Sequence, residues 1–254
     1  MITGSDHAWQ KWGVRDPYYA VYAEEKFRSG QIDERAREEF FRSGEQHIDR
    51  VLSVIRERLK PGFRPSSALD FGCGVGRLLV RLSQCTDRVV GVDVSEGMLA
   101  EARRNMEEMK IANVTLVGSD DRLSQVPGSF DLVHSHIVLQ HIPVRRGMGM
   151  IGELLARLNN GGVAFVQVTY GRAGSPLRRT LNGMIRRSRI LSGVSAMLRG
   201  TPWGDPPMQM NLYDTTALLA LFRANGIGNV YVQLREGLGY SSAEFWCLKD
   251  DSPL

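Results

Sequence analysis

Three alternating glycines, Gly72, Gly74 and Gly76, lie between two acidic residues, Asp70 and Asp93. Glycine tolerates positive φ and lets the backbone approach a ligand without a Cβ in the way. Free N–H groups at the start of a following helix favour a polar or anionic ligand group. Asp93 comes 17 residues after Gly76, which suits a βαβ unit whose second strand presents a carboxylate to ribose hydroxyls. The pattern predicts a nucleotide-type site, although tight turns in any α/β protein also use glycine.

Three histidines, His134, His136 and His141, fall within eight positions and are candidates for acid–base chemistry. Imidazole titrates near neutrality and can take a proton from an attacking hydroxyl. We expect His141 to face a substrate, with His136 as the second candidate base. Strand alternation puts His134 and His136 on one face. No fourth ligand is evident for a metal, so no metal site is predicted. A histidine that caps a helix or hydrogen-bonds in the core is the alternative for each.

The elements that must position these residues alternate between strand and helix. Apolar runs predict strands at 67–71, 88–95, 114–117, 130–136 and 162–170. Helical spacing predicts helices at 32–41, 45–59 and 145–158, a helix after the glycines, and one that begins after Ser95 as its N-cap. Strands that alternate with helices in this way predict an α/β fold.

The stretch from Leu69 to Gly76, together with 91–95 and Met98–Leu99, resembles the first two motifs of class I S-adenosylmethionine-dependent methyltransferases. An acid precedes the glycines, and they run GxGxG, unlike the GxGxxG of a dinucleotide fingerprint. The resemblance covers roughly residues 44–249. It implies a Rossmann-like, seven-stranded, mostly parallel sheet with helices on both faces and an antiparallel hairpin formed by the last two strands. An NAD-type Rossmann domain and a non-catalytic copy are the alternatives.

The resemblance also implies a role for individual residues toward S-adenosylmethionine. Asp70 would fix the amino group of the methionine moiety directly or through water, and Asp93 would accept hydrogen bonds from both ribose hydroxyls. Ser119 or Asp120 would read the edge of adenine, because the acid that is usual in this family is shifted by one place here. The other residues expected at the cofactor are Gly72, Cys73, Gly74, Gly76, Val94, Met98, Ile137 and Tyr22.

Residues 1–43 form an aromatic-rich leader ahead of the methyltransferase domain expected at 44–254. In this family such a leader often folds over the cofactor as a lid, so that Tyr18, Tyr19 or Tyr22 would touch the ligand. The alternative is that these aromatic side chains pack a preceding helix onto the core.

A basic insertion at 171–210 interrupts the pattern and is expected to form a helical cap. No Asp or Glu occurs from Leu154 to Gly204, and this stretch holds eight arginines, so with a net charge of +4 the rest of the chain carries −4. Leucines and other apolar residues follow helical spacing over 177–199. Such a helix can contact an anionic membrane surface, clamp a phosphate or carboxylate, or present a solvated basic face. No nucleic-acid-binding motif is present, and no nucleic-acid partner is expected.

Composition places the chain among ordinary globular proteins. Of its 254 residues, 43% are hydrophobic and 24% are charged. It shows no secretory signal-peptide pattern and no apolar run that could span a bilayer. Its three cysteines lack metal-ligand spacing, so we expect a cytoplasmic protein with reduced thiols. The sequence does not indicate an oligomeric state.

The sequence therefore predicts transfer of a methyl group from S-adenosylmethionine to a small molecule. The available histidines favour a hydroxyl acceptor, that is, an O-methyltransferase, and the arginines favour an anionic, sugar or lipid-linked acceptor. The alternatives are N-methylation of a small amine and a catalytically silent cofactor-binding subunit.

Overall fold

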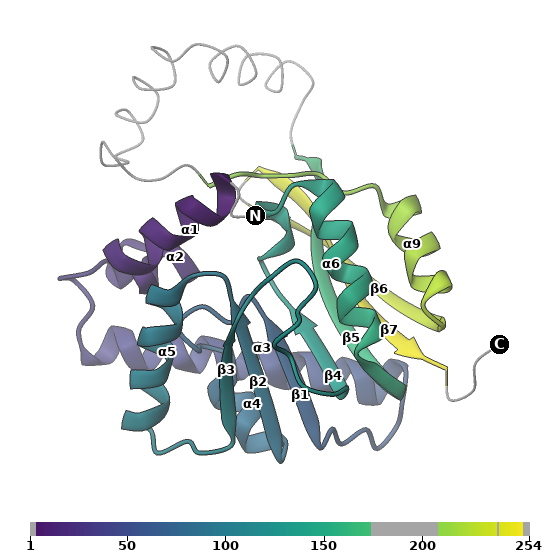
Figure 1. Cartoon of the computed structure of the whole chain (residues 1–254), viewed down its shortest axis with the longest axis horizontal. Coiled ribbons are helices and arrows are strands. Elements are labelled where there is room, and N and C mark those ends of the chain that lie inside the picture. The colour runs from purple at the N-terminus through teal and green to yellow at the C-terminus, as the bar shows by residue number, and fades with distance from the viewer. Residues whose placement is uncertain (1–3, 174–207, 238, 251–254) are drawn as a thin grey trace, which may run out of the picture.

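The structure is a computed structural model that describes residues 4–173, 208–237 and 239–250. Seven strands form one sheet in the order β3-β2-β1-β4-β5-β7-β6 (Figure 1). Strands β1 to β5 pair in parallel, whereas β7 runs antiparallel to both β5 and β6. The predicted seven-stranded sheet and its antiparallel edge are confirmed. The strands are β1 Ser67–Phe71, β2 Arg88–Asp93, β3 Val114–Gly118, β4 Phe130–Ser135, β5 Leu158–Arg172, β6 Ile227–Gly237 and β7 Tyr240–Lys249.

Helices cover both faces of the sheet, and strand alternation divides the core into two layers. Ala68 faces the layer under α3, α4 and α5, and its neighbour Leu69 faces the layer under α6 and α9. The helices described are α1 Gly4–Arg15, α2 Pro17–Val21, α3 Glu34–Arg58, α4 Leu79–Cys85, α5 Glu96–Glu108, α6 Val144–Ala156 and α9 Thr215–Ala224, with 3₁₀ turns η1 Glu25–Phe27 and η2 Leu139–His141.

Helix α3 is a single helix of 25 residues where two helices, 32–41 and 45–59, were expected. Asp33 caps its start by accepting a hydrogen bond from Ala36 N at 2.7 Å. Gly44 does not break it. A Cβ at that position would lie 2.3 Å from the carbonyl oxygen of Arg77, so glycine here lets α3 approach the glycine turn. The absence of a side chain at Gly44 therefore allows α3 to pack closely against the glycine turn.

Two further boundaries differ from the expectation. The helix after the glycines begins only at Leu79, because residues 74–78 form turns. Strand β5 begins at Leu158, four residues before the strand start expected at 162 and at the last residue of the helix expected at 145–158. Asn159 supports this extension, since its amide donates to Asp131 Oδ1 at 2.8 Å, and the pairing of β4 with β5 is irregular between Phe130 and Leu132.

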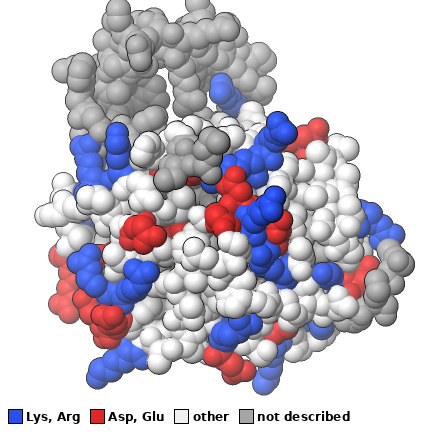
Figure 2. Space-filling view, viewed as in Figure 1, with Lys and Arg blue, Asp and Glu red and all other residues white. Residues whose placement is uncertain are grey.

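Most of the basic insertion, including 177–199, lies outside the described residues. Over the part that the structure describes, no helix is long and apolar enough to cross a membrane. On the face shown in Figure 2, the described acidic and basic side chains lie interspersed.

Candidate active site

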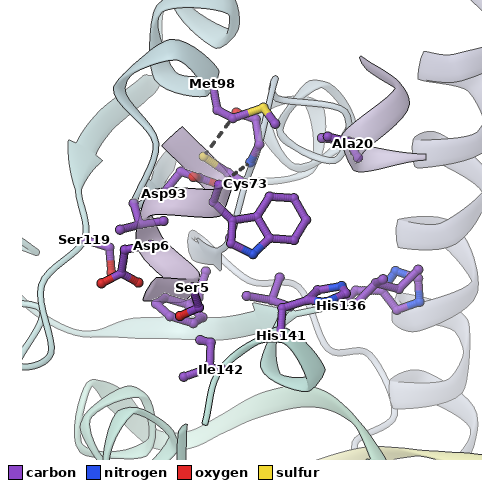
Figure 3. A pocket seen from close by; sticks show the side chains of 18 of the residues that line it. Ser5, Asp6, Ala20, Cys73, Asp93, Met98, Ser119, His136, His141 and Ile142 are labelled. Carbon is purple, nitrogen blue, oxygen red and sulfur yellow. Dashed lines mark hydrogen bonds between the residues drawn. The ribbon is translucent and has the colours of Figure 1, made fainter. Parts of the chain in front are cut away.

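A pocket of about 920 Å³ lies beyond the carboxyl ends of β1, β2 and β4, the edge at which open α/β sheets bind ligands. Figure 3 shows Asp93 and Ser119 on one side of it and His136 and His141 on another. Ten of the predicted site residues line this pocket: Gly72, Cys73, Gly74, Asp93, Val94, Met98, Ser119, His136, Ile137 and His141. Four others, Asp70, Gly76, Asp120 and Tyr22, are not among its lining residues.

The glycine turn requires glycine for conformation and for space. Gly72 has φ of 78° and Gly74 has φ of 54°, in the left-handed region that other residues rarely adopt. A Cβ on Gly72 would lie 2.2 Å from Val138, and one on Gly74 would lie 2.5 Å from Val21. The N–H groups of Gly72 and Cys73 donate to Val92 O at 2.7 and 2.9 Å, which ties the turn to the end of β2.

Asp93 joins the glycine turn to the start of α5. Its Oδ2 accepts from Gly74 N and its Oδ1 accepts from Ser95 N, both at 2.9 Å. Ser95 in turn caps α5, as predicted, by accepting from Met98 N. Burial raises the pKa of the Asp93 carboxyl to about 6 despite these hydrogen bonds. The carboxylate is thus held in position in the pocket wall. Each of its two oxygens has a further lone pair that can accept a hydrogen bond from a hydroxyl donor.

Asp70 lies beneath the turn, 1% exposed, and takes part in a buried histidine cluster. Its Oδ1 is 2.8 Å from His134 Nδ1, and His134 Nε2 is 2.9 Å from His47 Nε2. The ring of His47 also stacks on that of His136, with centroids 4.0 Å apart. Asp70 Oδ2 is buried and has no hydrogen-bond partner in the described part of the chain. His47 was not predicted, because it comes from α3, 87 positions before His134.

The two candidate bases differ in their hydrogen bonding. His141 Nδ1 is 2.7 Å from the backbone oxygen of Gln209, which only accepts, so Nδ1 carries the proton and the Nε2 lone pair faces the Gln140 amide nitrogen, 3.3 Å away. His136 Nδ1 is buried without a partner in the described chain. Burial lowers the pKa of both imidazoles, so both are neutral at pH 7. Within the described residues no group of His, Cys, Asp and Glu side chains is arranged to hold a metal ion.

Ile137 adopts an unusual backbone conformation between these histidines. Its φ of 61° is rare for a β-branched residue, and its N–H donates to Gln167 Oε1 at 2.9 Å. The side chain is 41% exposed and lines the pocket. Strain of this kind concentrates at functional sites.

Helix α1 covers one side of the pocket. Ser5, Asp6 and Trp9 line it, and Trp9 packs edge-on against His141 with ring centroids 5.0 Å apart. Gln10 holds α1 in place, because its Nε2 donates to Val94 O at 2.7 Å. These contacts agree with the lid expected of the leader.

Other aromatic residues of the leader serve the core instead. Trp12, Tyr18 and Phe27 are buried in the layer under α3. Tyr22 stacks on Phe27 at 5.3 Å and does not line the pocket, to which Val21 contributes instead. Residues of the leader thus divide between the pocket wall and the core, and the lid itself stays a prediction.

The structure distinguishes the two adjacent candidates, Ser119 and Asp120, by their position relative to the pocket. Ser119 lines the pocket at the end of β3. The Asp120 carboxylate instead closes its own loop by accepting from Arg122 N at 3.0 Å and Ser124 N at 2.9 Å. The structure therefore favours Ser119 over Asp120 for contact with the nucleobase of a bound ligand.

Sequence reasoning missed several lining residues. Trp9 and Asp6 lie far from any motif, and Arg146 on α6 reaches Asp6 Oδ1 at 2.6 Å across the pocket. Arg77 is the exception, because it follows the last glycine directly and could have been singled out by that position.

Comparison with known proteins agrees with this geometry. Residues 68–162 match the family described as "Methyltransferase domain". Magnesium-protoporphyrin O-methyltransferase of Synechocystis is 33% identical over 109 residues, which are 42% of this chain and 47% of that protein. Ubiquinone biosynthesis O-methyltransferase of Pseudomonas aeruginosa is 32% identical over 85 residues, 33% of this chain and 37% of that one. The chain thus matches less than half the length of either relative.

The fold matches solved structures over nearly its whole length. The crystal structure of magnesium protoporphyrin IX methyltransferase from Synechocystis with bound S-adenosylhomocysteine covers 97% of this chain and 100% of its own, with a TM-score of 0.59 and 20% identity. The GxGxG turn after an acid, the pocket that it lines and the family match agree. Residues 68–162 therefore resemble a methyltransferase domain in sequence, and the fold of the chain is that of solved methyltransferases.

Proposed function

We propose that this protein transfers a methyl group from S-adenosylmethionine to a hydroxyl of a small-molecule acceptor. One observation carries the proposal: the glycine turn and the Asp93 carboxylate share a pocket of about 920 Å³ with a neutral histidine, His141. The two curated relatives above are both named O-methyltransferases.

The lining residues fit the cofactor. Gly72 and Gly74 leave backbone exposed where the methionine moiety would lie, and side chains there would instead meet Val138 and Val21. Asp93 would accept hydrogen bonds from the ribose hydroxyls, and Ser119 would contact adenine. Asp70 Oδ2, a buried acceptor without a described partner, suits the amino group, directly or through water. When bound, the cofactor supplies a methyl group on a positively charged sulfur, which is a strong electrophile.

We infer that His141 acts as the general base. The Gln209 carbonyl holds the proton on Nδ1, so Nε2 would take the proton of the acceptor hydroxyl. A bound cofactor would supply the methyl group to that oxygen, and its carbon–sulfur bond would break to release S-adenosylhomocysteine. The Gln140 amide nitrogen lies 3.3 Å from Nε2 and donates to the same lone pair, so this long hydrogen bond must open before Nε2 can accept a proton from a substrate. His136, whose ring is held by stacking on His47, is the second candidate.

The wall near His141 favours an acceptor with an apolar body. Trp9 packs against His141, and Ile142 and Met150 are further apolar residues of the pocket lining. Arg146 also lines the pocket, but it is paired with Asp6 and Asp121, each at 2.6 Å. The preference for an anionic or lipid-linked acceptor, and membrane contact through 177–199, rest mainly on the six of the eight arginines that lie outside the described residues, and both remain proposals from the sequence.

Thermal melts with S-adenosylmethionine and S-adenosylhomocysteine test cofactor binding. A ligand at 100 times its Kd stabilises the native state by about 2.7 kcal/mol, which raises the Tm. We expect this for the wild type and for Asp120→Ala, the matched control outside the pocket, and a much smaller rise for Asp93→Ala. No stabilisation of the wild type by either compound would remove the proposal.

Methyl transfer from radiolabelled cofactor to a panel of hydroxyl-bearing aromatic compounds then tests the acceptor class. Turnover that depends on His141 supports a hydroxyl acceptor. Turnover only with amines, unaffected by His141→Gln, would indicate an N-methyltransferase instead. Tight cofactor binding without turnover on any acceptor would indicate a silent subunit.

A further inference from the structure

Arg77 is a buried cation in the pocket wall. It follows Gly76 directly, is 8% exposed and lines the pocket. Its Nη1 donates to Ser43 Oγ at 3.0 Å, and its guanidinium lies over the rings of Tyr22 and Phe40, 5.6 and 6.0 Å from their centroids. Its Nε is buried and has no hydrogen-bond partner in the described chain. All of its direct partners there are neutral.

Other arginines of similar burial in this protein have a carboxylate in contact. Arg28 pairs with Asp16 at 3.2 Å and Arg146 pairs with Asp6 at 2.6 Å. A guanidinium stays charged in proteins, and a buried charge without a counter-ion is costly. Among the described residues, Arg77 forms no such ion pair.

Asp70 acts on Arg77 electrostatically but does not bind it. Its field opposes the lowering of the Arg77 pKa that burial causes. Asp70 Oδ1 is already taken by His134 at 2.8 Å. A direct negative partner for the Arg77 guanidinium must therefore come from outside the described chain, and the pocket is the open side from which a ligand can supply it.

We propose that Arg77 binds the carboxylate of the methionine moiety of S-adenosylmethionine. The inference rests on the proposed function and extends it to a residue that selects the amino-acid end of the cofactor. Arg77 is adjacent in sequence to the glycine turn, whereas Asp93 and Ser119 stand at the ribose and adenine end. A carboxylate fits a guanidinium because two parallel N–H donors can meet its two oxygens, which an ammonium cannot reproduce.

Two ligands that differ in the amino-acid moiety provide the test, measured by calorimetry without any acceptor. S-adenosylhomocysteine carries the carboxylate, and 5′-methylthioadenosine lacks the amino-acid part. We expect Arg77→Met to weaken S-adenosylhomocysteine about 10- to 100-fold, the range for a hydrogen bond to a charged group, and to leave methylthioadenosine almost unchanged. Arg77→Lys keeps the charge but loses the paired donors, so its effect is intermediate.

Arg50→Met is the matched control, because Arg50 is also partly buried beside the histidine cluster but pairs with Glu244 at 2.8 Å. It should leave the preference between the two ligands as in the wild type. Equal weakening of both ligands by Arg77→Met would mean a structural role and overturn the proposal. So would unchanged binding, or a loss that appears only once an acceptor is present. Failure of the wild type to bind either ligand would instead refute the proposed function.

Discussion

Acidification should weaken cofactor binding through Asp93. Its carboxyl has a pKa of about 6 in the free protein because burial disfavours the charge. Only the ionised form has acceptors for both ribose hydroxyls, and above pH 6 it prevails. From pH 7 to pH 5 the ionised fraction falls from about ten elevenths to about one eleventh, so the Kd of S-adenosylhomocysteine should rise about tenfold, or about 1.4 kcal/mol.

Isothermal titration at pH 7, 6 and 5 and constant ionic strength measures this change. Asp93→Asn serves as the variant, because its amide does not titrate and its weaker binding should vary little over the same range. Asp120→Asn serves as the control, because that carboxylate lies outside the pocket and its pKa is lowered by its own loop. It should behave as the wild type does.

Two results would refute the reasoning. One is a wild-type Kd that is the same within twofold at pH 7 and pH 5. The other is a tenfold loss that persists in Asp93→Asn, which would assign the titration to another group in the pocket, such as a histidine.

Three further predictions concern residues around the same pocket. His141→Gln should slow methylation of a hydroxyl acceptor by about 10²- to 10⁴-fold in kcat and leave the Kd of S-adenosylhomocysteine unchanged; equal activity would exclude a base at this position. Gly72→Ala should lower the free energy of unfolding, measured in urea, by about 1–3 kcal/mol from backbone strain alone, and its Cβ would add a clash 2.2 Å from Val138. The second substitution Val138→Ala should therefore relieve the clash but not the backbone strain. The pKa values of His47 and His136 lie well below 6.5 in the folded state. The unfolded chain therefore binds protons first as the pH falls below about 6.5, and each histidine then lowers the free energy of unfolding by up to about 1.4 kcal/mol per pH unit. His47→Phe should reduce this loss, and a free energy of unfolding that stays constant from pH 7.5 to 5.5 would contradict the prediction.

Local signals in the sequence predicted much of the fold and part of the site. The apolar runs, the Ser95 cap and the glycine turn depend on neighbouring residues, and the structure contains each of them. Asp93 could be placed because one βαβ unit determines its distance from Gly76. Where two adjacent residues competed, as Ser119 and Asp120 did, the choice depended on a hydrogen bond within the loop that spacing does not reveal.

Contacts between distant segments could not be predicted in this way. Asp70 was expected at the cofactor, yet its Oδ1 is bonded to His134, 64 positions later, and that histidine meets His47 from α3. Such contacts depend on how α3 lies across the sheet, and the close approach at Gly44 allows it. A single sequence contains no local pattern that specifies this approach.

The docking of α1 has a consequence for synthesis on the ribosome. Asp6 and its partner Arg146 are 140 positions apart, and Gln10 contacts Val94, 84 positions later. At about 5–20 residues per second, roughly 7–28 s pass between translation of the two members of the first pair. For roughly the first 4–17 s of that interval, before Val94 and α5 have been made, the face of α1 that carries the buried Trp12 lacks its packing partner. A nascent chain of this protein is therefore expected to expose its first helix to chaperones until α5 has been made.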